Sequence, residues 1–235
     1  MDLLDAAHRK HMIHALVEAD VTETRQRIRD LRKASGEYVS FTGYMIHAVA
    51  SAVERHPVVH AYRNRMNKLV LFKEVDVSTT IERKVQGRNE VVPRIIRAAN
   101  RKSVAEISEE IRQEQSGELD RSEVYRGIRR YLAVPAIIRR TGFRILDRSP
   151  GMMKRRAGTV MVTSVGMYGE GAGWGIPVAS HTLNVTVGGI VPRPVLKNGE
   201  LESRKHVCLT VSFNHDIVDG APAARFIREL KRQIE

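Results

Sequence analysis

The chain has 235 residues, of which 42% are hydrophobic and 28% are charged, a composition that is typical of a globular protein and excludes wholesale disorder. A single cysteine, Cys208, excludes a disulfide framework. With 39 Lys and Arg against 27 Asp and Glu, the formal net charge is +12, which favours a phosphate-bearing partner or an acidic surface.

Most of this charge lies in one segment, which we call the basic block, at residues 121–156. It holds eleven Lys and Arg residues but only Glu123 and Asp147 as acidic ones, so that it carries +9 of the total. We expect no signal peptide, because the first residues lack a basic region followed by an apolar core. The longest apolar run, Leu132–Ile138, is far shorter than the ~20 residues of a membrane span. The sequence therefore predicts a soluble, cytoplasmic chain.

The N-terminal part is predicted to form a strand and two helices. The strand covers 14–21, and the first helix covers 22–33 with Thr22 as its N-cap. The second helix runs from its cap, Thr42, to Pro57. It is expected to be buried, because one wide face is apolar. That face consists of Tyr44, Met45, Ala48, Val49, Ala52 and Val53.

Two strands and a helix are predicted next. Apolar residues alternate over 69–81, interrupted only by Lys73, which predicts one long strand. A shorter strand follows at 90–96. Ser103 is expected to cap a helix that ends near Gln115.

The basic block is predicted to contain two helices, at 123–132 and 136–146, divided at Pro135. The composition then changes to short apolar strands joined by loops rich in glycine. These strands are expected at 158–165, 181–190 and 207–214.

Two dipeptides predict tight turns in this region, Gly188–Gly189 and Asn198–Gly199. A helix at 221–235 ends the chain. There is no internal repeat and no low-complexity linker, so the elements predict one α/β domain with a mixed sheet.

A candidate catalytic motif follows the last predicted strand, where residues 214–220 read NHDIVDG. A strand end holds an imidazole at a sheet edge, and a neutral His215 can take a proton from a thiol or hydroxyl near neutral pH. Asp219 stands where the chain turns into the last helix, so that it can cap that helix. The same pattern also fits an ordinary loop histidine.

The stretch 209–226 resembles the C-terminal signature of the 2-oxoacid dehydrogenase acyltransferases, the dihydrolipoyl acyltransferase catalytic domains, which share their fold with chloramphenicol acetyltransferase. Three further segments resemble the family in the right order. They are FTGY at 41–44, residues 75–108 with VPRIIR at 92–97, and TSVGMYG at 163–169. The resemblance implies an α/β two-layer sandwich with a mixed β-sheet and helices packed on one face. Residues 1–235 are then a single acyltransferase catalytic-type domain, with the basic block as a helical insertion at about 121–156.

The resemblance also implies roles for individual residues. The family's general base, which deprotonates the attacking thiol, falls on His215, and its supporting acidic residue falls on Asp219. The hydroxyl that donates to the oxyanion falls on Thr163, where the family usually has serine, and Ser164 is the alternative. Either residue also fits a strand-end hydroxyl bonded to backbone.

The chain departs from the family in several places. The usual Asp-His-Arg is replaced by Asn214-His215-Asp216, so that an aspartate stands where the family has a cation. The basic residues usually found in the family's first helix have only Arg9 and Lys10 as candidates. Lipoyl and subunit-binding domains are absent from the sequence, which predicts a free-standing domain.

The predicted function is a coenzyme A-dependent acyltransferase that moves an acyl group between coenzyme A and a dihydrolipoyl group supplied by another chain. The resemblance implies a homotrimer in which His215 and Thr163 meet across a subunit interface. One alternative is transfer from acyl-coenzyme A to a small hydroxyl or amine acceptor. Another is an inactive scaffold, or a homologue that docks on an anionic membrane through 121–156. The basic block also fits a plain solvated or packed insertion.

Nucleic acid and metal ions are not expected as ligands. There is no nucleic-acid reading motif, and aromatic residues make up only 5% of the chain. His8, His11 and His14 are spaced three residues apart, but no carboxylate or fourth ligand accompanies them. His47, His56 and His60 are expected on a helix surface or at the helix end.

Overall fold

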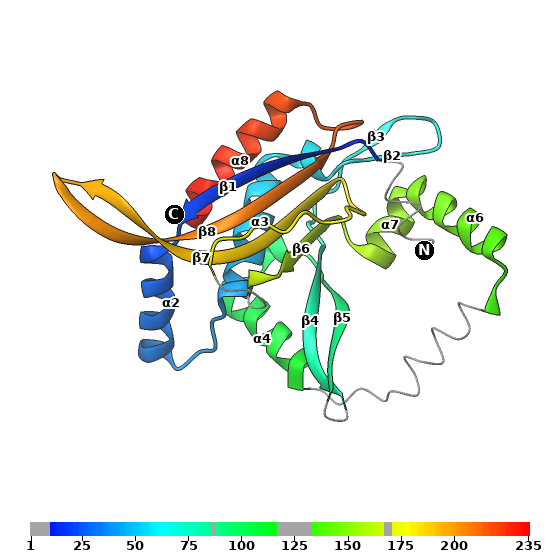
Figure 1. The fold of residues 1–235 in the computed structure, drawn as a ribbon. Helices are drawn as coiled ribbons and strands as arrows, with labels where there is room; N and C mark the ends of the chain where they lie inside the picture. Colours follow the sequence, from blue (N-terminus) through cyan, green and yellow to red (C-terminus); the bar gives the residue numbers. More distant parts are fainter. Residues whose placement is uncertain (1–9, 86–87, 117–132, 167–170) are drawn as a thin grey trace.

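The structure is a computed structural model that describes residues 10–85, 88–116, 133–166 and 171–235. Six strands form one mixed sheet in the order β1-β8-β7-β6-β4-β5 (Figure 1). Strand β6 runs parallel to both β4 and β7, and the other neighbouring strands are antiparallel. The strands are β1 (Met12–Asp20), β4 (Val77–Val85), β5 (Arg88–Ile96), β6 (Val160–Ser164), β7 (Leu183–Lys197) and β8 (Glu200–Asn214).

Helices cover one face of this sheet (Figure 1). Val162, Val185 and Val211 stand in register on three neighbouring strands and are buried in the core beneath the helices. The apolar face predicted for the second helix is confirmed, since Met45 and Val49 are fully buried. The longer helices are α2 (Thr22–Ser35), α3 (Phe41–Arg55), α4 (Val104–Ser116) and α8 (Gly220–Ile234).

An extended segment, residues 171–180, crosses the other face of the sheet. The indole Nε1 of Trp174 donates to the Val17 carbonyl on β1 at 3.2 Å. The preceding residue packs against the neighbouring part of the sheet, since a Cβ on Gly188 of β7 would lie 2.0 Å from the Gly173 carbonyl oxygen. Polar residues of this second face are thereby buried without a helix above them. They include Asn184, Thr186, Thr210 and Ser212.

The predicted turn at Gly188–Gly189 is wrong, because both glycines lie inside β7. The register changes from Val187 opposite Leu209 to Ile190 opposite Val207, so that two residues of β7 oppose one of β8. This is a β-bulge, which bends the strand and increases its twist. Glycine is required there because the crossing segment runs directly against the bulge.

The single strand predicted at 69–81 is also wrong, since it is divided into β3 (Leu69–Val70) and the start of β4. Between the two pieces, side-chain oxygens accept hydrogen bonds from the backbone N–H groups. The Val75 N–H donates to Asn100 Oδ1 at 2.9 Å, and the Asp76 N–H donates to Thr159 Oγ1 at 3.1 Å. Residues whose donors are bonded in this way cannot extend a ladder. β3 pairs instead with β2 (Tyr62–Arg63).

Of the caps predicted for the first three helices, only Ser103 is confirmed. Ser103 accepts from the Glu106 N–H at 3.2 Å, while the Ser103 N–H donates to Glu106 Oε2 at 2.7 Å, which completes a capping box. Thr22 is the first residue of α2 rather than its N-cap. Ser40, not Thr42, caps α3 by accepting from the Gly43 N–H at 2.9 Å.

Part of the basic block is described, and it forms α6 (Ala136–Asp147) and α7 (Pro150–Ala157). The helix predicted at 123–132 lies outside the described residues. The C-terminal end of α7 is fixed to the body, because the Arg97 guanidinium donates to the Lys154 carbonyl at 2.7 Å and the Arg155 carbonyl at 2.5 Å. Within the described ranges, no helix combines the length and apolar character needed to cross a membrane.

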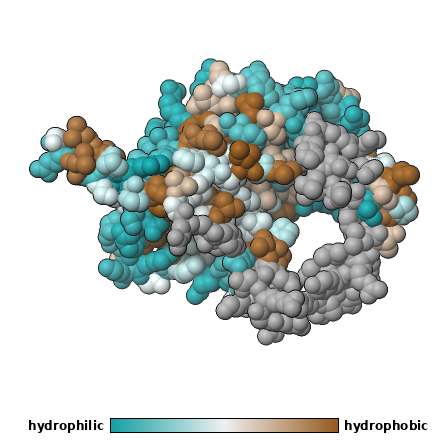
Figure 2. All heavy atoms as spheres, viewed as in Figure 1, coloured by the Kyte–Doolittle hydropathy of each residue, from teal (hydrophilic) through white to brown (hydrophobic). Residues whose placement is uncertain are grey.

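The hairpin of β7 and β8 projects beyond the body of the molecule (Figure 1). Its turn is formed by Asn198 and Gly199, both with positive φ, which confirms the predicted tight turn. Leu196 and Leu201 face each other across the two strands and are 70% and 75% exposed. The tip of the hairpin therefore carries apolar surface (Figure 2).

Candidate active site

His215 lies in a short, rigid loop between β8 and α8. The His215 N–H donates to the His11 carbonyl at 2.7 Å, which ties the loop to the start of β1. The Asn214 carbonyl accepts from both the Ile217 and the Val218 N–H groups at 3.0 Å, and the Val218 side chain is fully buried. The imidazole is thus presented at one end of the sheet from a backbone with fixed geometry.

Asp219 stands close to this imidazole and immediately precedes α8. Its Oδ1 lies 3.8 Å from His215 Nδ1, which is an electrostatic contact rather than a hydrogen bond. The side chains are 46% and 84% exposed for His215 and Asp219. Asp219 occupies the N-cap position, but its carboxylate accepts no capping bond, so the predicted capping role is wrong. The carboxylate is left available to orient the imidazole.

The two candidate hydroxyls lie on opposite faces of β6. Thr163 stands beside Thr186 of β7, with the two Oγ1 atoms 3.4 Å apart, on the face that the segment 171–180 crosses. Ser164 is on the helix side, where it lines two cavities, of about 560 and 310 Å³, together with Thr42 at the start of α3. Only one of the two hydroxyls can therefore serve a given site.

Thr163 and His215 do not meet within one chain. The register places Thr163 opposite Thr186, and Thr186 opposite Thr210 of β8. His215 lies five residues beyond Thr210, which at 3.3 Å per residue is roughly 16 Å along the strand. β7 also lies between β6 and β8. A site that uses both residues needs two copies of the chain.

A cavity of about 410 Å³ adjoins the His215 loop. Asn214, Asp216 and Ile217 form one wall of it. The opposite walls come from the segment after η1 (Pro57–His60) and from Arg148, at the junction of α6 and α7. The charged lining residues are Lys10, Arg63, Arg65, Arg148 and Asp216.

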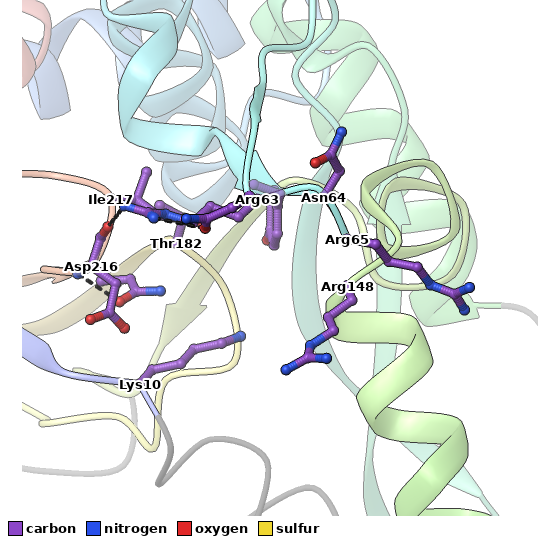
Figure 3. Close-up of a pocket in the computed structure, with 11 residues that line it drawn as sticks. Lys10, Arg63, Asn64, Arg65, Arg148, Thr182, Asp216 and Ile217 are labelled. Atoms are coloured by element: carbon purple, nitrogen blue, oxygen red, sulfur yellow. Dashed lines mark hydrogen bonds between the residues drawn. The ribbon is translucent and has the colours of Figure 1, made fainter.

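In Figure 3, Lys10 and Arg148 extend toward the same open space, while Arg65 points away from it. The sequence had singled out Lys10 as a candidate basic residue, but Arg63 and Arg148 were missed. The charge pattern gave a signal for Arg148 only, because it belongs to the basic block. Arg63 stands alone in the sequence, and only the fold brings it to this end of the sheet.

Two of the described histidines outside this loop are buried. His181 Nε2 donates to the Ala157 carbonyl at 2.8 Å, and its Nδ1 accepts from the Ser180 hydroxyl at 2.8 Å. Burial lowers the pKa of His181 to about 4. His60 was expected near a helix surface or end. It follows the end of α3 but is completely buried, and burial lowers its pKa to about 4.

Three further histidines have ordinary partners, while His8 lies outside the described residues. His11 Nδ1 lies 2.8 Å from Asp216 Oδ1, and His14 Nδ1 lies 2.7 Å from the Ser212 hydroxyl. His47 Nδ1 is 3.0 Å from the Lys102 carbonyl. Within the described ranges, no three His, Cys, Asp or Glu side chains are grouped so that they can hold a metal ion.

The architecture is that of chloramphenicol acetyltransferase. A solved chloramphenicol acetyltransferase superposes with a TM-score of 0.53 at 14% identity, covering 100% of this chain and 94% of its own. A probable dihydrolipoamide acetyltransferase from Listeria monocytogenes superposes with a TM-score of 0.70 at 22% identity, covering 99% of this chain and 88% of its own. The predicted fold class, a mixed sheet with helices on one face, is confirmed.

The sequence matches the family described as 2-oxoacid dehydrogenases acyltransferase (catalytic domain) over residues 2–123 and 144–235. The chain belongs to this family. The unmatched residues between these two ranges, 124–143, fall inside the basic block.

A curated relative is the dihydrolipoyllysine-residue acetyltransferase component of the pyruvate dehydrogenase complex of Staphylococcus epidermidis, 24% identical over 238 residues. The match covers 98% of this chain and 47% of that protein, so that the chain spans about half the length of the relative.

Proposed function

We propose that this chain transfers acyl groups between coenzyme A and a dihydrolipoyl group, with His215 as the general base. The observation that carries the proposal is the position of His215: a half-exposed imidazole on a rigid loop at a strand end, in a chain that belongs to an acyltransferase family. A half-exposed imidazole can reach a thiol, and its fixed backbone holds it in one direction.

The chemistry needs one proton to move twice. His215 takes the proton of the attacking thiol, and the resulting thiolate adds to the thioester carbonyl. A hydroxyl donor stabilises the tetrahedral oxyanion, and the C–S bond to the leaving thiol then breaks while His215 returns the proton to that sulfur. The Asp219 carboxylate, with Oδ1 3.8 Å from His215 Nδ1, lies beside the imidazole that carries the proton between the two transfers.

The distance between Thr163 and His215 supports a second part of the proposal, which concerns assembly. We place the complete site between two copies of the chain, one giving His215 and the other giving Thr163 for the oxyanion. A closed trimer provides three such sites. The lipoyl group is supplied by another protein chain, and residues 1–235 form one catalytic domain.

The test is an acyl-transfer assay with acetyl-, propionyl- and branched acyl-coenzyme A as donors and dihydrolipoamide as acceptor. His215→Ala is expected to lower kcat roughly 10²- to 10⁴-fold, the usual contribution of a general base. His47→Ala is the matched control, because His47 lies on α3 in the helix layer. Absence of transfer from every donor, or full activity in His215→Ala, contradicts the proposal.

A second candidate function, docking on an anionic membrane, is favoured by one observation on α6. Ile137 and Ile138 are 79% and 60% exposed on a helix whose sequence also holds Arg139, Arg140 and Arg144. Apolar surface together with positive charge suits the interface of an anionic bilayer. Co-sedimentation with phosphatidylserine vesicles is expected for the wild type and not for Ile137→Ser/Ile138→Ser. Equal sedimentation of the two proteins excludes this function.

A further inference from the structure

We propose that Lys10, Arg63 and Arg148 form a binding site for a compact anionic group, a carboxylate or a phosphate, in the cavity beside the His215 loop. The identity of the molecule that carries this group rests on the proposed function, because the carrier is then a substrate of His215. The binding site itself follows from the charge and geometry of the cavity.

The first argument is the imbalance of charge. Four cationic side chains line the cavity against one carboxylate, Asp216. That carboxylate is already engaged, since its Oδ1 lies 2.8 Å from His11 Nδ1. Among the described residues, no hydrogen-bond or ion-pair partner is found for the Arg148 side chain. Like charges repel at close range, so a cluster of this kind is favourable when an anion lies between its members.

The second argument is that the side chains are held in position. The Arg63 guanidinium donates to Asn67 Oδ1 at 2.9 Å and to the Asp216 carbonyl at 2.5 Å, which binds it to the His215 loop. Lys10 Nζ donates to the Ser180 carbonyl at 2.5 Å. A guanidinium has five N–H donors, so Arg63 retains donors for a ligand beside its two bonds.

The third argument concerns Arg148. This residue belongs to the basic block, but the segment that contains it is anchored to the rest of the molecule. Arg148 stands two residues before α7, and α7 is fixed at several points. The Lys154 ammonium lies 2.8 Å from Glu74 Oε2, and the Ala157 carbonyl accepts from His181. Pro150 and Met153 of the same helix are buried. Anchoring of α7 thus brings the side chain of Arg148 toward Lys10 (Figure 3).

The fourth argument is proximity to the proposed chemistry. Asn214, Asp216 and Ile217, which flank His215 in the sequence, line the cavity. An anionic group bound here is therefore close to the thioester on which His215 acts. At position 216 the resemblance leads one to expect a cation, and this chain has an aspartate. The cations in this structure come instead from three separate segments beside the same loop.

Two sources of such a group are compatible with the proposed substrates. One is a carboxylate at the end of the acyl chain, as in succinyl-coenzyme A. The other is a phosphate of coenzyme A itself. Both are compact oxyanions, which arginine recognises with paired N–H donors.

The experiment separates these sources with Arg63→Gln and Arg148→Gln. Isothermal titration calorimetry compares the binding of coenzyme A with that of pantetheine, which lacks the phosphates. Transfer assays compare KM for succinyl-coenzyme A with KM for butyryl-coenzyme A, a neutral donor of similar length. Arg156→Gln is the matched control, because it removes an exposed arginine of α7 that does not line the cavity. Arg148→Lys tests whether charge alone is sufficient.

Loss of a charge-assisted hydrogen bond is expected to weaken recognition of the anion about tenfold or more. If the anion is an acyl carboxylate, KM rises by this factor for succinyl-coenzyme A and by less for butyryl-coenzyme A. If it is a phosphate, the dissociation constant rises by this factor for coenzyme A and by less for pantetheine. Arg148→Lys is expected to recover part of either loss. The proposal is overturned if the variants leave both comparisons unchanged, or if Arg156→Gln has the same effect.

Failure of the proposed function gives a different result. If the wild-type protein transfers no acyl group, calorimetry with succinate and with inorganic phosphate still tests the cavity. Binding that Arg148→Gln weakens supports the anion site, and absence of binding of both ions overturns it.

Discussion

At the scale of single residues, the hydroxyls of Thr163 and Ser164 differ most clearly in the face of the sheet that they occupy. Thr163 lies beside Thr186 beneath the crossing segment, and Ser164 lines cavities next to α3. Because neighbouring residues of a strand point to opposite faces, the two positions can be tested separately.

Thr163→Ala is expected to lower kcat about 10²- to 10³-fold with little change in KM, since an oxyanion donor acts mainly in the transition state. Thr163→Ser retains the hydroxyl and is expected to keep most of the activity. Steady-state kinetics on these variants and on Ser164→Ala decide between the two residues. A large loss in Ser164→Ala with little loss in Thr163→Ala would transfer the role to Ser164.

A second prediction at this scale concerns His181, which burial keeps neutral with a pKa of about 4. An unfolded chain takes up the proton at the ordinary pKa of 6.5, so below that value the unfolded state binds more protons than the folded state. The free energy of unfolding must therefore fall as the pH is lowered from 6.5 toward 4. His60 acts in the same direction.

His181→Gln keeps an N–H donor for the Ala157 carbonyl but removes the titration. Between about pH 7 and about pH 5, the wild type is expected to lose about 2 kcal/mol more of unfolding free energy than this variant. Urea unfolding at a fixed protein concentration measures the difference. Identical pH dependence in the two proteins would show that His181 does not titrate in this range.

At the scale of elements, the bulge in β7 and the segment 171–180 depend on each other. A Cβ on Gly188 would come within 2.0 Å of the Gly173 carbonyl oxygen, and one on Gly189 within 2.1 Å of the Gly171 carbonyl oxygen. Both contacts are with backbone, so neither can be relieved by turning a side chain. The crossing segment therefore has to move if either glycine gains a side chain.

Gly188→Ala is expected to destabilise the fold by about 2–3 kcal/mol, as overpacking against backbone does. Gly142→Ala is the matched control, because Gly142 lies within α6 with no atom within 4 Å of the added Cβ. It is expected to stabilise by about 0.5–1 kcal/mol, since alanine favours a helix over glycine. Thermal or urea unfolding tests the pair. Equal stability of Gly188→Ala and the wild type would mean that the crossing segment shifts without cost.

The same elements show how far the sequence can predict this fold. Long periodic segments, such as α3 and α8, were predicted to within two residues because the spacing of their apolar residues marks the face that is buried. The break before β4 depends on Asn100 and Thr159, which are distant in the sequence but bond the backbone there. The glycines of β7 were assigned to a turn because their local sequence does not show that the segment 171–180 packs against them. Lys73, a charged residue at an apolar position of the predicted strand, was the local sign of the break.

The candidate site also has a part that is local in the sequence and a part that only the fold assembles. The motif that contains His215 and Asp219 is local, so its residues could be singled out in the sequence, although their roles came from the resemblance to the family. The cavity beside it requires Lys10 before β1, Arg63 on β2 and Arg148 before α7, and no single window of the sequence contains them. The fold brings them together.

At the scale of the whole molecule, one chain holds both residues of the proposed site, but in places too far apart to act together. His215 stands at the end of β8, and Thr163 stands on β6 with β7 between, roughly 16 Å away along the strand direction. A rigid sheet cannot bring the two together by bending. If both residues act at one site, as proposed, activity depends on association between copies.

Mixing two inactive variants tests this dependence directly. His215→Ala retains Thr163, and Thr163→Ala retains His215, so an intact pair of residues can form only where one copy of each meets. A site is intact only where a Thr163→Ala copy supplies His215 and its neighbour, a His215→Ala copy, supplies Thr163. Random assembly of equal amounts produces this pair at about a quarter of the interfaces, so about a quarter of the wild-type activity is expected to return. Refolding or co-expressing the variants together and assaying the mixture measures the recovery. If each site lay within a single chain, the mixture would show only the average activity of the two variants.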